Sequence, residues 1–231
     1  MMKQLNKTNL GWLILIALMV VVLFVGVSSN VISPFYQITL VTILINVILA
    51  IGLNLVIGFS GQFSLGHAGF MAIGAYSGAI IGDKIEGLPG FFAGLFVGMF
   101  ISIVVALIVG IPTLRLKGDY LAIATLGVAE IIRILILNMG DLTNGARGIS
   151  GISFPFESNM SFIMVLFLIV IVTSIITINY IHSSPGRATI AIREDEIAAE
   201  SMGVNATTYK VIAFMIGAAT ASIAGSLYGT Y

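Results

Sequence analysis

Residues 52–78 read GLNLVIGFSGQFSLGHAGFMAIGAYSG, and this stretch decides the fold. It places glycines and uncharged polar side chains within an apolar background. A polar group without a partner is costly in lipid, so each of these side chains must find a hydrogen-bond partner or face water. The stretch therefore predicts a pathway through a membrane. Unwound or re-entrant backbone is tolerated there only where protein or water surrounds it.

The rest of the sequence has the composition of a membrane protein. Of its 231 residues, 58% are hydrophobic and 9% are charged, whereas soluble domains have roughly 25% charged residues. Apolar runs of about 20 residues, enough to cross a hydrocarbon layer of roughly 30 Å, recur along the chain. We predict an all-α fold, a polytopic transmembrane helical bundle that forms one membrane domain over residues 1–231. The balanced charge gives no reason to expect nucleic acid, and the lack of cysteine excludes disulfides and thiolate metal sites.

We expect about seven membrane spans, of which the third is short and rich in glycine, and we expect the polar segment before it to be an unwound or re-entrant element. They lie near residues 10–27, 36–57, 68–82, 89–111, 120–138, 161–180 and 211–231. Basic loop residues accumulate on the cytoplasmic side. A cytoplasmic N-terminus places seven of them inside and only Lys84 and Arg147 outside. Because the sequence stops directly after an apolar run, we also expect a C-terminally shortened chain.

Polar side chains within the opening stretch are the first candidates for function. They are Asn54, Ser60, Gln62, Ser64 and His67. A polar-lined substrate passage accounts for all five together, and Gly61 leaves room beside them for a close approach. The glycines have a second interpretation, since small residues also let membrane helices pack tightly. For His67 alone, a hydrogen-bonded structural histidine is the alternative to a proton carrier.

Two charges lie inside the predicted span YLAIATLGVAEIIRILILN. Glu130 and Arg133 are three residues apart, so they share one helical face and can neutralise each other. Ionisable residues within membrane spans are candidates for ion or substrate pathways. We include Glu130 among the passage residues, with a purely structural ion pair as the equal alternative.

Residues 182–210 are the one long polar stretch, and we predict a cytoplasmic loop. Ser184 suits the N-cap of a helix, Pro185 its first turn and Gly203 its end. Apolar side chains recur every seven residues, at Ile190, Ile197 and Val204. This gives one helix with an apolar stripe and a charged flank. A helix that anchors to a membrane surface should be rich in lysine and arginine, whereas this one is acidic at its centre. Contact with a protein partner fits better.

At these residues the sequence resembles the permease subunit of ABC importers for branched-chain amino acids, the LivM type, a family that includes urea and short-amide permeases. The resemblance rests on three ordered blocks and covers the chain from Asn46 onward. The blocks are GLNLVIGFSGQFSLGHAGFMAIGAY (52–76), PTLRLKGDYLAIATLGVAEIIRILILN (112–138) with LTNGARGISGI (142–152), and SPGRATIAIREDEIAAESMGVN (184–205).

The resemblance implies a multi-pass permease of the prokaryotic cytoplasmic membrane, surrounded by lipid, that moves branched-chain amino acids inward. Its implied partners are a second permease subunit, two cytoplasmic ATPase subunits and an extracytoplasmic substrate-binding protein. The chain has no G-x-x-x-x-G-K-[ST] phosphate loop, so we expect a partner rather than this chain to be the enzyme that hydrolyses ATP. No cofactor or metal is expected.

Residues 188–204 resemble the coupling helix with which such permeases contact an ATPase. The residues expected to take part are Arg193, Glu194, Asp195, Glu196, Ala199 and Gly203. The segment departs from the importer pattern EAA-x-x-x-G, because Ile197 stands between Glu196 and the two alanines before Gly203.

Two other classes of protein stay open as alternatives. Residues 58–61 match the G-x-S-G pattern of rhomboid intramembrane proteases, with Ser60 as nucleophile and His67 or His182 as base. The match is short, and His67 is only seven residues from Ser60 rather than on a separate helix. A proton- or sodium-coupled secondary transporter shares the broken-helix design. That alternative leaves the acidic cytoplasmic helix without a role.

Overall fold

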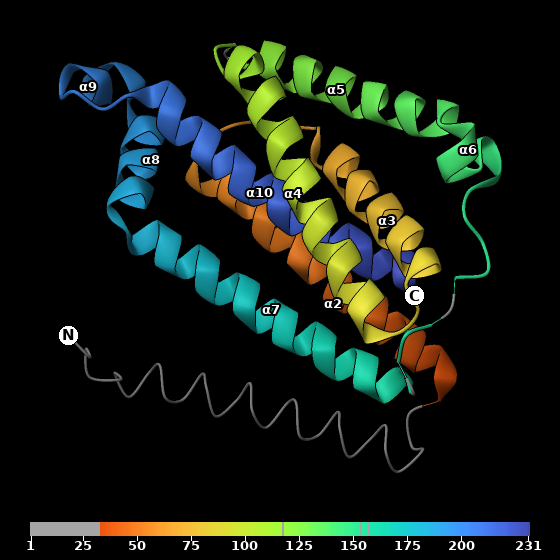
Figure 1. The fold of residues 1–231 in the computed structure, drawn as a ribbon. Helices are drawn as coiled ribbons and strands as arrows, with labels where there is room; N and C mark the ends of the chain where they lie inside the picture. The colour runs from red at the N-terminus through yellow and green to blue at the C-terminus, as the bar shows by residue number, and fades with distance from the viewer. Residues whose placement is uncertain (1–32, 117, 153, 157) are drawn as a thin grey trace, which may run out of the picture.

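The computed structural model describes residues 33–116, 118–152, 154–156 and 158–231 (Figure 1). Every regular element among them is a helix, which confirms the expected all-α fold. The long helices are α2 (Pro34–Leu53), α3 (His67–Lys84), α4 (Leu88–Thr113), α5 (Asp119–Asn138), α7 (Asn159–His182) and α10 (Ala206–Thr230). A π-helix, η1 (Asn54–Phe59), continues α2. The short helices are α6 (Gly140–Thr143), η2 (Gly145–Arg147), α8 (Ser184–Glu194) and α9 (Glu196–Ser201).

Five of these helices are long and apolar enough to cross a membrane: α2 with η1, α4, α5, α7 and α10. Helix α3 lies where the third span was expected, but it falls outside this group. It has only 18 residues, begins with His67 and ends with Asp83 and Lys84. The expected span at residues 10–27 lies outside the described residues, so the total of seven spans stays a prediction.

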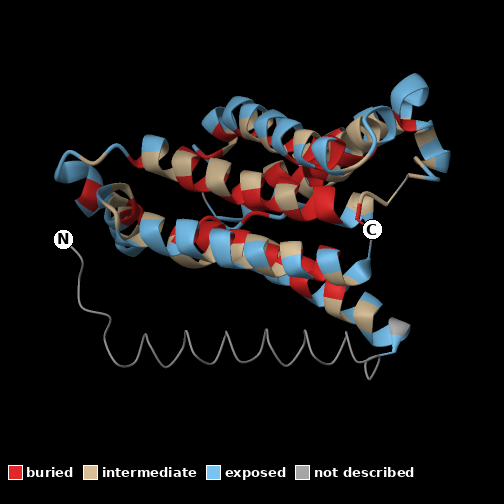
Figure 2. Ribbon diagram, turned by 60° about the horizontal axis from the view of Figure 1, so that its bottom comes forward, coloured by how far each residue is buried: buried red, intermediate tan, exposed pale blue. Residues whose placement is uncertain are grey.

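Helix α10 runs through the middle of the bundle, with α2, α3 and α4 around it and α5 and α7 on opposite outer sides (Figure 1). Its most apolar window is 67% buried, against 22% for α5. In Figure 2 the buried residues accordingly gather between the helices, while the outer helices are mostly exposed. An outer face of this kind suits lipid or further protein.

Small residues let α3 and α10 approach closely. A Cβ atom added at Gly74 would lie 1.9 Å from the backbone oxygen of Ser222, and one at Gly225 would lie 1.9 Å from that of Met71. Neither distance is possible for real atoms, so a glycine is required at both positions. The tight helix packing that we considered for the glycines is thus present at this crossing.

Successive long helices alternate in direction, so the bundle has two distinct ends (Figure 1). At one end lie η1, the α4–α5 turn, α8 and α9, and we call this the α8 end. The other end carries the turn between α3 and α4, together with α6 and η2, and we call it the α6 end. Between η1 and α3, at the α8 end, residues 60–66 run without helical structure. We call residues 60–66 the connecting segment; it is the unwound element expected before the third span.

The loop helix expected from Ser184 to Gly203 is wrong in two details. It begins one residue earlier, because the Ser183 hydroxyl accepts a hydrogen bond from the Gly186 amide and is the N-cap. It is also two helices, because Asp195 adopts an extended conformation and its carboxylate accepts the Ala198 amide at 3.0 Å. An aspartate that caps a new helix in this way interrupts the preceding one. The apolar residues that recur every seven positions therefore do not form one continuous stripe.

Candidate functional site

The connecting segment turns its polar side chains inward. Ser60, Gln62 and Ser64 are buried, whereas Phe63 and Leu65, which alternate with them, are exposed. Alternate side chains of extended backbone point to opposite sides. The segment therefore presents polar groups to the protein interior and apolar groups to its surroundings, as suits a chain at the edge of a membrane.

Hydrogen bonds fasten this segment to two helices. The Gln62 side-chain amide donates to the Ser60 hydroxyl and, at 3.0 Å, to the backbone oxygen of Lys210 at the start of α10. The Leu65 amide donates to the Thr125 hydroxyl of α5 at 3.0 Å. The segment is thus held between α5 and α10 at the α8 end.

Two buried polar atoms here have no hydrogen-bond partner among the described residues: Gln62 Oε1 and His67 Nε2. Buried polar groups are nearly always paired with protein or water, so a pair of unpaired ones marks a place where a polar molecule can bind. Both atoms are uncharged hydrogen-bonding groups rather than fixed charges. They suit water or a neutral or zwitterionic solute.

Asn54 and Glu130 do not join this buried group. Asn54 is exposed, and its side-chain oxygen lies against Gly58, where a Cβ atom would be 2.2 Å away. Glu130 lies on the exposed face of α5, whereas Thr125 of the same helix is buried. The Glu130 carboxylate accepts hydrogen bonds from Arg133 Nε at 2.8 Å and from Arg133 Nη2 at 2.5 Å. The structure therefore buries Ser60, Gln62 and Ser64 in one short segment, with His67 next along the chain, and leaves the Glu130–Arg133 ion pair on an outer surface.

Ser60 lacks the surroundings of a catalytic serine. The hydrogen bond to its hydroxyl comes from the amide of Gln62, which cannot act as a general base. The serine is buried at the α8 end. This geometry offers no support for the protease alternative.

The charged residues of the loop fall into two groups, and one of them faces inward. Arg193 Nη1 donates to the backbone oxygen of Gly58 at 2.7 Å, and its guanidinium also pairs with Glu194. Glu196 Oε1 lies 2.9 Å from Lys210 Nζ. Ala199 is buried with Ile192 and Ala206 in a small apolar cluster. Part of the expected coupling set therefore packs against the bundle.

The second group faces away from the bundle. Ile197 is 74% exposed and Met202 is 85% exposed. Around them lie Glu194, Asp195 and Glu200, all exposed. Gly203 follows with a φ angle of +84° and nothing within 4 Å of a Cβ placed there, so it forms the turn into α10. The tip of the loop, which we call the knob, therefore exposes two large apolar side chains and three acidic ones within nine residues of sequence.

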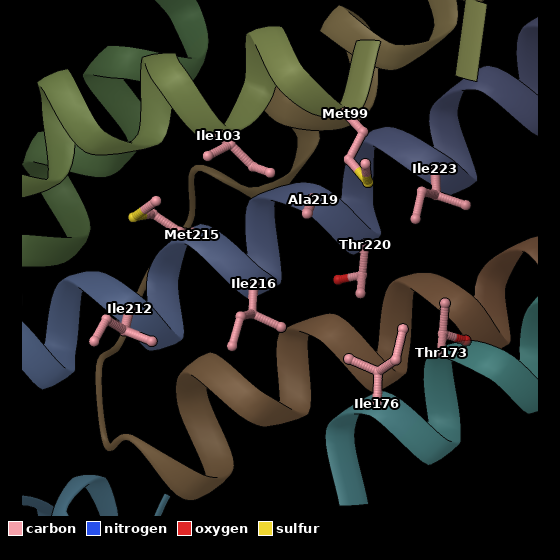
Figure 3. Close-up of a pocket in the computed structure, with 10 residues that line it drawn as sticks. All are labelled: Met99, Ile103, Thr173, Ile176, Ile212, Met215, Ile216, Ala219, Thr220 and Ile223. Atoms are coloured by element: carbon pink, nitrogen blue, oxygen red, sulfur yellow. The ribbon is translucent and has the colours of Figure 1, made fainter. Parts of the chain in front are cut away.

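A groove of about 290 Å³ lies between α4, α7 and α10 (Figure 3). Its lining includes Met99, Ile176 and Ile216, and its two threonines, Thr173 and Thr220, donate their hydroxyl protons to backbone oxygens of their own helices. The groove can therefore accept an aliphatic chain but offers no partner for an ammonium or a carboxylate. On these contacts alone it is not an amino-acid site.

Comparison of the sequence with known proteins places the chain in a family. The family model for the branched-chain amino acid transport system permease component matches residues 35–231. The chain belongs to this permease family. The expected resemblance and the expected function class are thereby confirmed at the level of the family.

Two curated relatives carry the description "High-affinity branched-chain amino acid transport system permease protein LivM". The one from Salmonella typhimurium is 38% identical and the one from Escherichia coli K12 is 37% identical, each over 80% of this chain. This permease spans about half the length of both relatives, since the match covers 50% of each. No solved structure matches the chain.

Several contacts of this permease were missed by sequence reasoning. Thr125 and Lys210 hold the connecting segment, and Arg193 reaches Gly58 across 135 positions of sequence. No local pattern links such distant residues. One local signal did set Arg193 apart: it is a basic residue that follows the largely apolar residues 188–192 and precedes three acidic residues.

Proposed function

We propose that this chain works as a permease subunit of an ATP-driven importer that moves branched-chain amino acids into the cytoplasm. The observation that carries the proposal is its membership of the branched-chain amino acid permease family. The printed description of the curated relatives supports the substrate class. The proposed partners are a second permease subunit, two cytoplasmic ATPase subunits and an extracytoplasmic substrate-binding protein.

The proposed orientation puts the α8 end in the cytoplasm of a prokaryotic cell. Its support is the distribution of basic side chains, because lysine and arginine accumulate in cytoplasmic loops. The α8 end carries Arg115, Arg187, Arg193 and Lys210, while the α6 end carries Lys84 and Arg147. Together with the span predicted at residues 10–27, this orientation puts the N-terminus in the cytoplasm.

The proposed ATPase contact is the tip of the loop around Ile197 and Met202. Large apolar side chains with this exposure on a polar loop are typical of a protein contact. The exposed carboxylates of Glu194, Asp195 and Glu200 in the same segment add charge that a basic surface can complement. Asp195 and Gly203 define the shape of the knob, since they end and redirect the helices on either side.

The proposed passage begins at the buried polar groups of the connecting segment, such as Gln62, and at His67 at the start of α3. ATP-driven movement of the partner subunits displaces α8 and α9, and the connecting segment follows because Gly61 contacts Arg193 of α8. Access to the passage then alternates between the two sides. Glu130 stays a candidate only for a pathway along the outer face of α5, beside a second subunit.

Transport by the full-length protein in its native host provides the test. We expect deletion of the gene to abolish ATP-dependent uptake of labelled leucine, and affinity purification in mild detergent to recover two ATPases and a second permease. A matched strain in which the phosphate-loop lysine of the ATPase is replaced, so that ATP is not hydrolysed, should lose uptake equally. Leucine uptake that persists in that strain and follows an ion gradient would instead establish the secondary transporter.

A further inference from the structure

The end of η1 depends on a side chain from the cytoplasmic loop. The last carbonyl groups of any helix lack partners within that helix. Two of them are satisfied by the chain that follows, because the Ser60 amide donates to Leu55 and the Gln62 amide to Val56, each at 3.1 Å. The Gly58 oxygen accepts instead from Arg193 Nη1, at 2.7 Å. A cation is also electrostatically favoured at this end of a helix.

The backbone beside this contact is shaped to admit the arginine. Gly61 has a φ angle of +67°, and a Cβ atom there would lie 2.7 Å from Arg193 Cγ. The aliphatic stem of Arg193 therefore occupies the space that a side chain at position 61 would need. The arginine touches both sides of the point where η1 ends and the connecting segment begins.

A second contact runs parallel to the first. Glu196, at the start of α9, pairs with Lys210, and the Lys210 backbone oxygen accepts from Gln62. Both members of the ion pair are largely shielded, with side chains 27% and 13% exposed. The loop helices α8 and α9 are each joined to the connecting segment by a charged residue, one directly and one through α10.

Helix α8 is also fixed firmly at its other end. The Tyr180 hydroxyl of α7 and the Thr189 hydroxyl of α8 are 2.8 Å apart, and Ser183 caps the helix between them. A Cβ atom at Gly186 would lie 2.0 Å from the Tyr180 backbone oxygen, so α7 and α8 are closely packed where they meet. A displacement applied to the loop is therefore passed on by α8 rather than absorbed at its ends.

We propose that Arg193 is a positioning residue that makes α8 and the end of η1 move as one rigid unit. The inference rests on the proposed function, because it needs a transport cycle in which the loop is displaced. It separates the role of Arg193 from those of two neighbours: Glu194 and Ile197 face a partner, whereas Arg193, itself 38% exposed, reaches the Gly58 oxygen and transmits the displacement inward. Loss of Arg193 should leave ATPase contact intact and disconnect ATP hydrolysis from transport.

Arg187 provides the matched control. It lies on the same helix, is exposed and carries the same charge, but its Nη1 donates to the His182 backbone oxygen at 2.8 Å. In the assembled transporter, we expect Arg193→Gln to lower the amount of leucine imported per ATP by about tenfold, the factor for one lost charge-assisted hydrogen bond. Arg187→Gln should leave this ratio unchanged. Arg193→Lys should be intermediate, since it keeps the charge without the planar fork.

A disulfide can replace the arginine. The sequence has no cysteine, and a Cβ atom at Gly61 would lie 3.4 Å from Arg193 Cβ, close to the roughly 3.5–4.5 Å of disulfides. The double variant Gly61→Cys/Arg193→Cys should be uncoupled when reduced and should regain import per ATP when oxidised. The two single variants should not respond to oxidation.

Oxidation that blocks uptake would overturn the inference, because the contact would then have to open during transport. Uptake per ATP that stays at the reduced level after oxidation would overturn it too. If the double variant does not insert into the membrane, the two glutamine variants still test the proposal. Equal amounts of leucine imported per ATP by Arg193→Gln and Arg187→Gln would refute it. Absence of leucine uptake by the wild type would refute the proposed function instead.

Discussion

At the scale of single residues, burial and pairing decide which side chains matter. Gln62 is buried because its amide has a specific acceptor, the Lys210 backbone oxygen. Its own side-chain oxygen is left without a partner among the described residues. One side chain thus joins the connecting segment to α10 and also carries a buried acceptor that the described residues leave unpaired.

Replacing Gln62 with methionine should separate these effects. The variant keeps the volume but removes the donor, so the Lys210 oxygen loses that partner, at a cost of about 0.5–1.5 kcal/mol. We expect a lower melting temperature in detergent for Gln62→Met. Phe63→Leu, at the exposed neighbouring position, should melt within error of the wild type, and a stable Gln62→Met variant would show that the hydrogen bond contributes little.

Single glycines differ in the sign of their effect. Gly127 has nothing within 4 Å of an added Cβ, whereas a Cβ at Gly225 meets the Met71 oxygen. Alanine is favoured over glycine in a helix by about 1 kcal/mol, so Gly127→Ala should stabilise the protein. Gly225→Ala should destabilise it by about 1–3 kcal/mol through overpacking. Thermal unfolding of both variants checks the opposite signs, and equal shifts would contradict the close α3–α10 contact.

At the scale of elements, the long helices were predictable and their interruptions were not. Apolar runs of sufficient length identify α4, α7 and α10 from composition alone. The break at Asp195 depends on which of two backbone conformations the aspartate adopts, and the surrounding pattern favoured one continuous helix. The inward position of Arg193 depends on a partner 135 residues away. Local sequence can single out the arginine but does not say which distant residue it meets.

The capping role of Asp195 can be measured directly. Asp195→Ala removes the acceptor for the Ala198 amide and should cost about 0.5–2 kcal/mol of local stability in α9. We expect faster amide hydrogen exchange across α9, with α8 unaffected. Asp195→Asn keeps a side-chain oxygen and should exchange at the wild-type rate; exchange that is equally slow in all three proteins would exclude the cap.

At the scale of the whole molecule, the two ends of the bundle differ in the number of basic side chains and in shape. One end carries the loop with exposed Met202, and the other carries the turns around Ala146 and Arg147. The membrane character of the fold and its family could be predicted from the sequence. The outward face of Glu130 could not, because helical spacing pairs it with Arg133 without saying which neighbour either one meets.

Labelling of single cysteines in intact cells should establish the orientation, because the sequence supplies no cysteine of its own. A membrane-impermeant maleimide should modify Ala146→Cys from outside. It should modify Met202→Cys only after the membrane is opened. The reverse pattern would invert the proposed topology while leaving the fold unchanged.

The close packing of α3 against α10 also bears on how the protein is synthesised. Helix α3 is the one long helix described here that lacks the composition to enter a membrane by itself, and the helix that accommodates it begins 122 residues later, at position 206 against 84. At translation rates of about 5–20 residues per second, α3 waits roughly 6–25 s for α10. During that interval the insertion machinery, rather than the protein's own core, must shelter its glycine-lined surface.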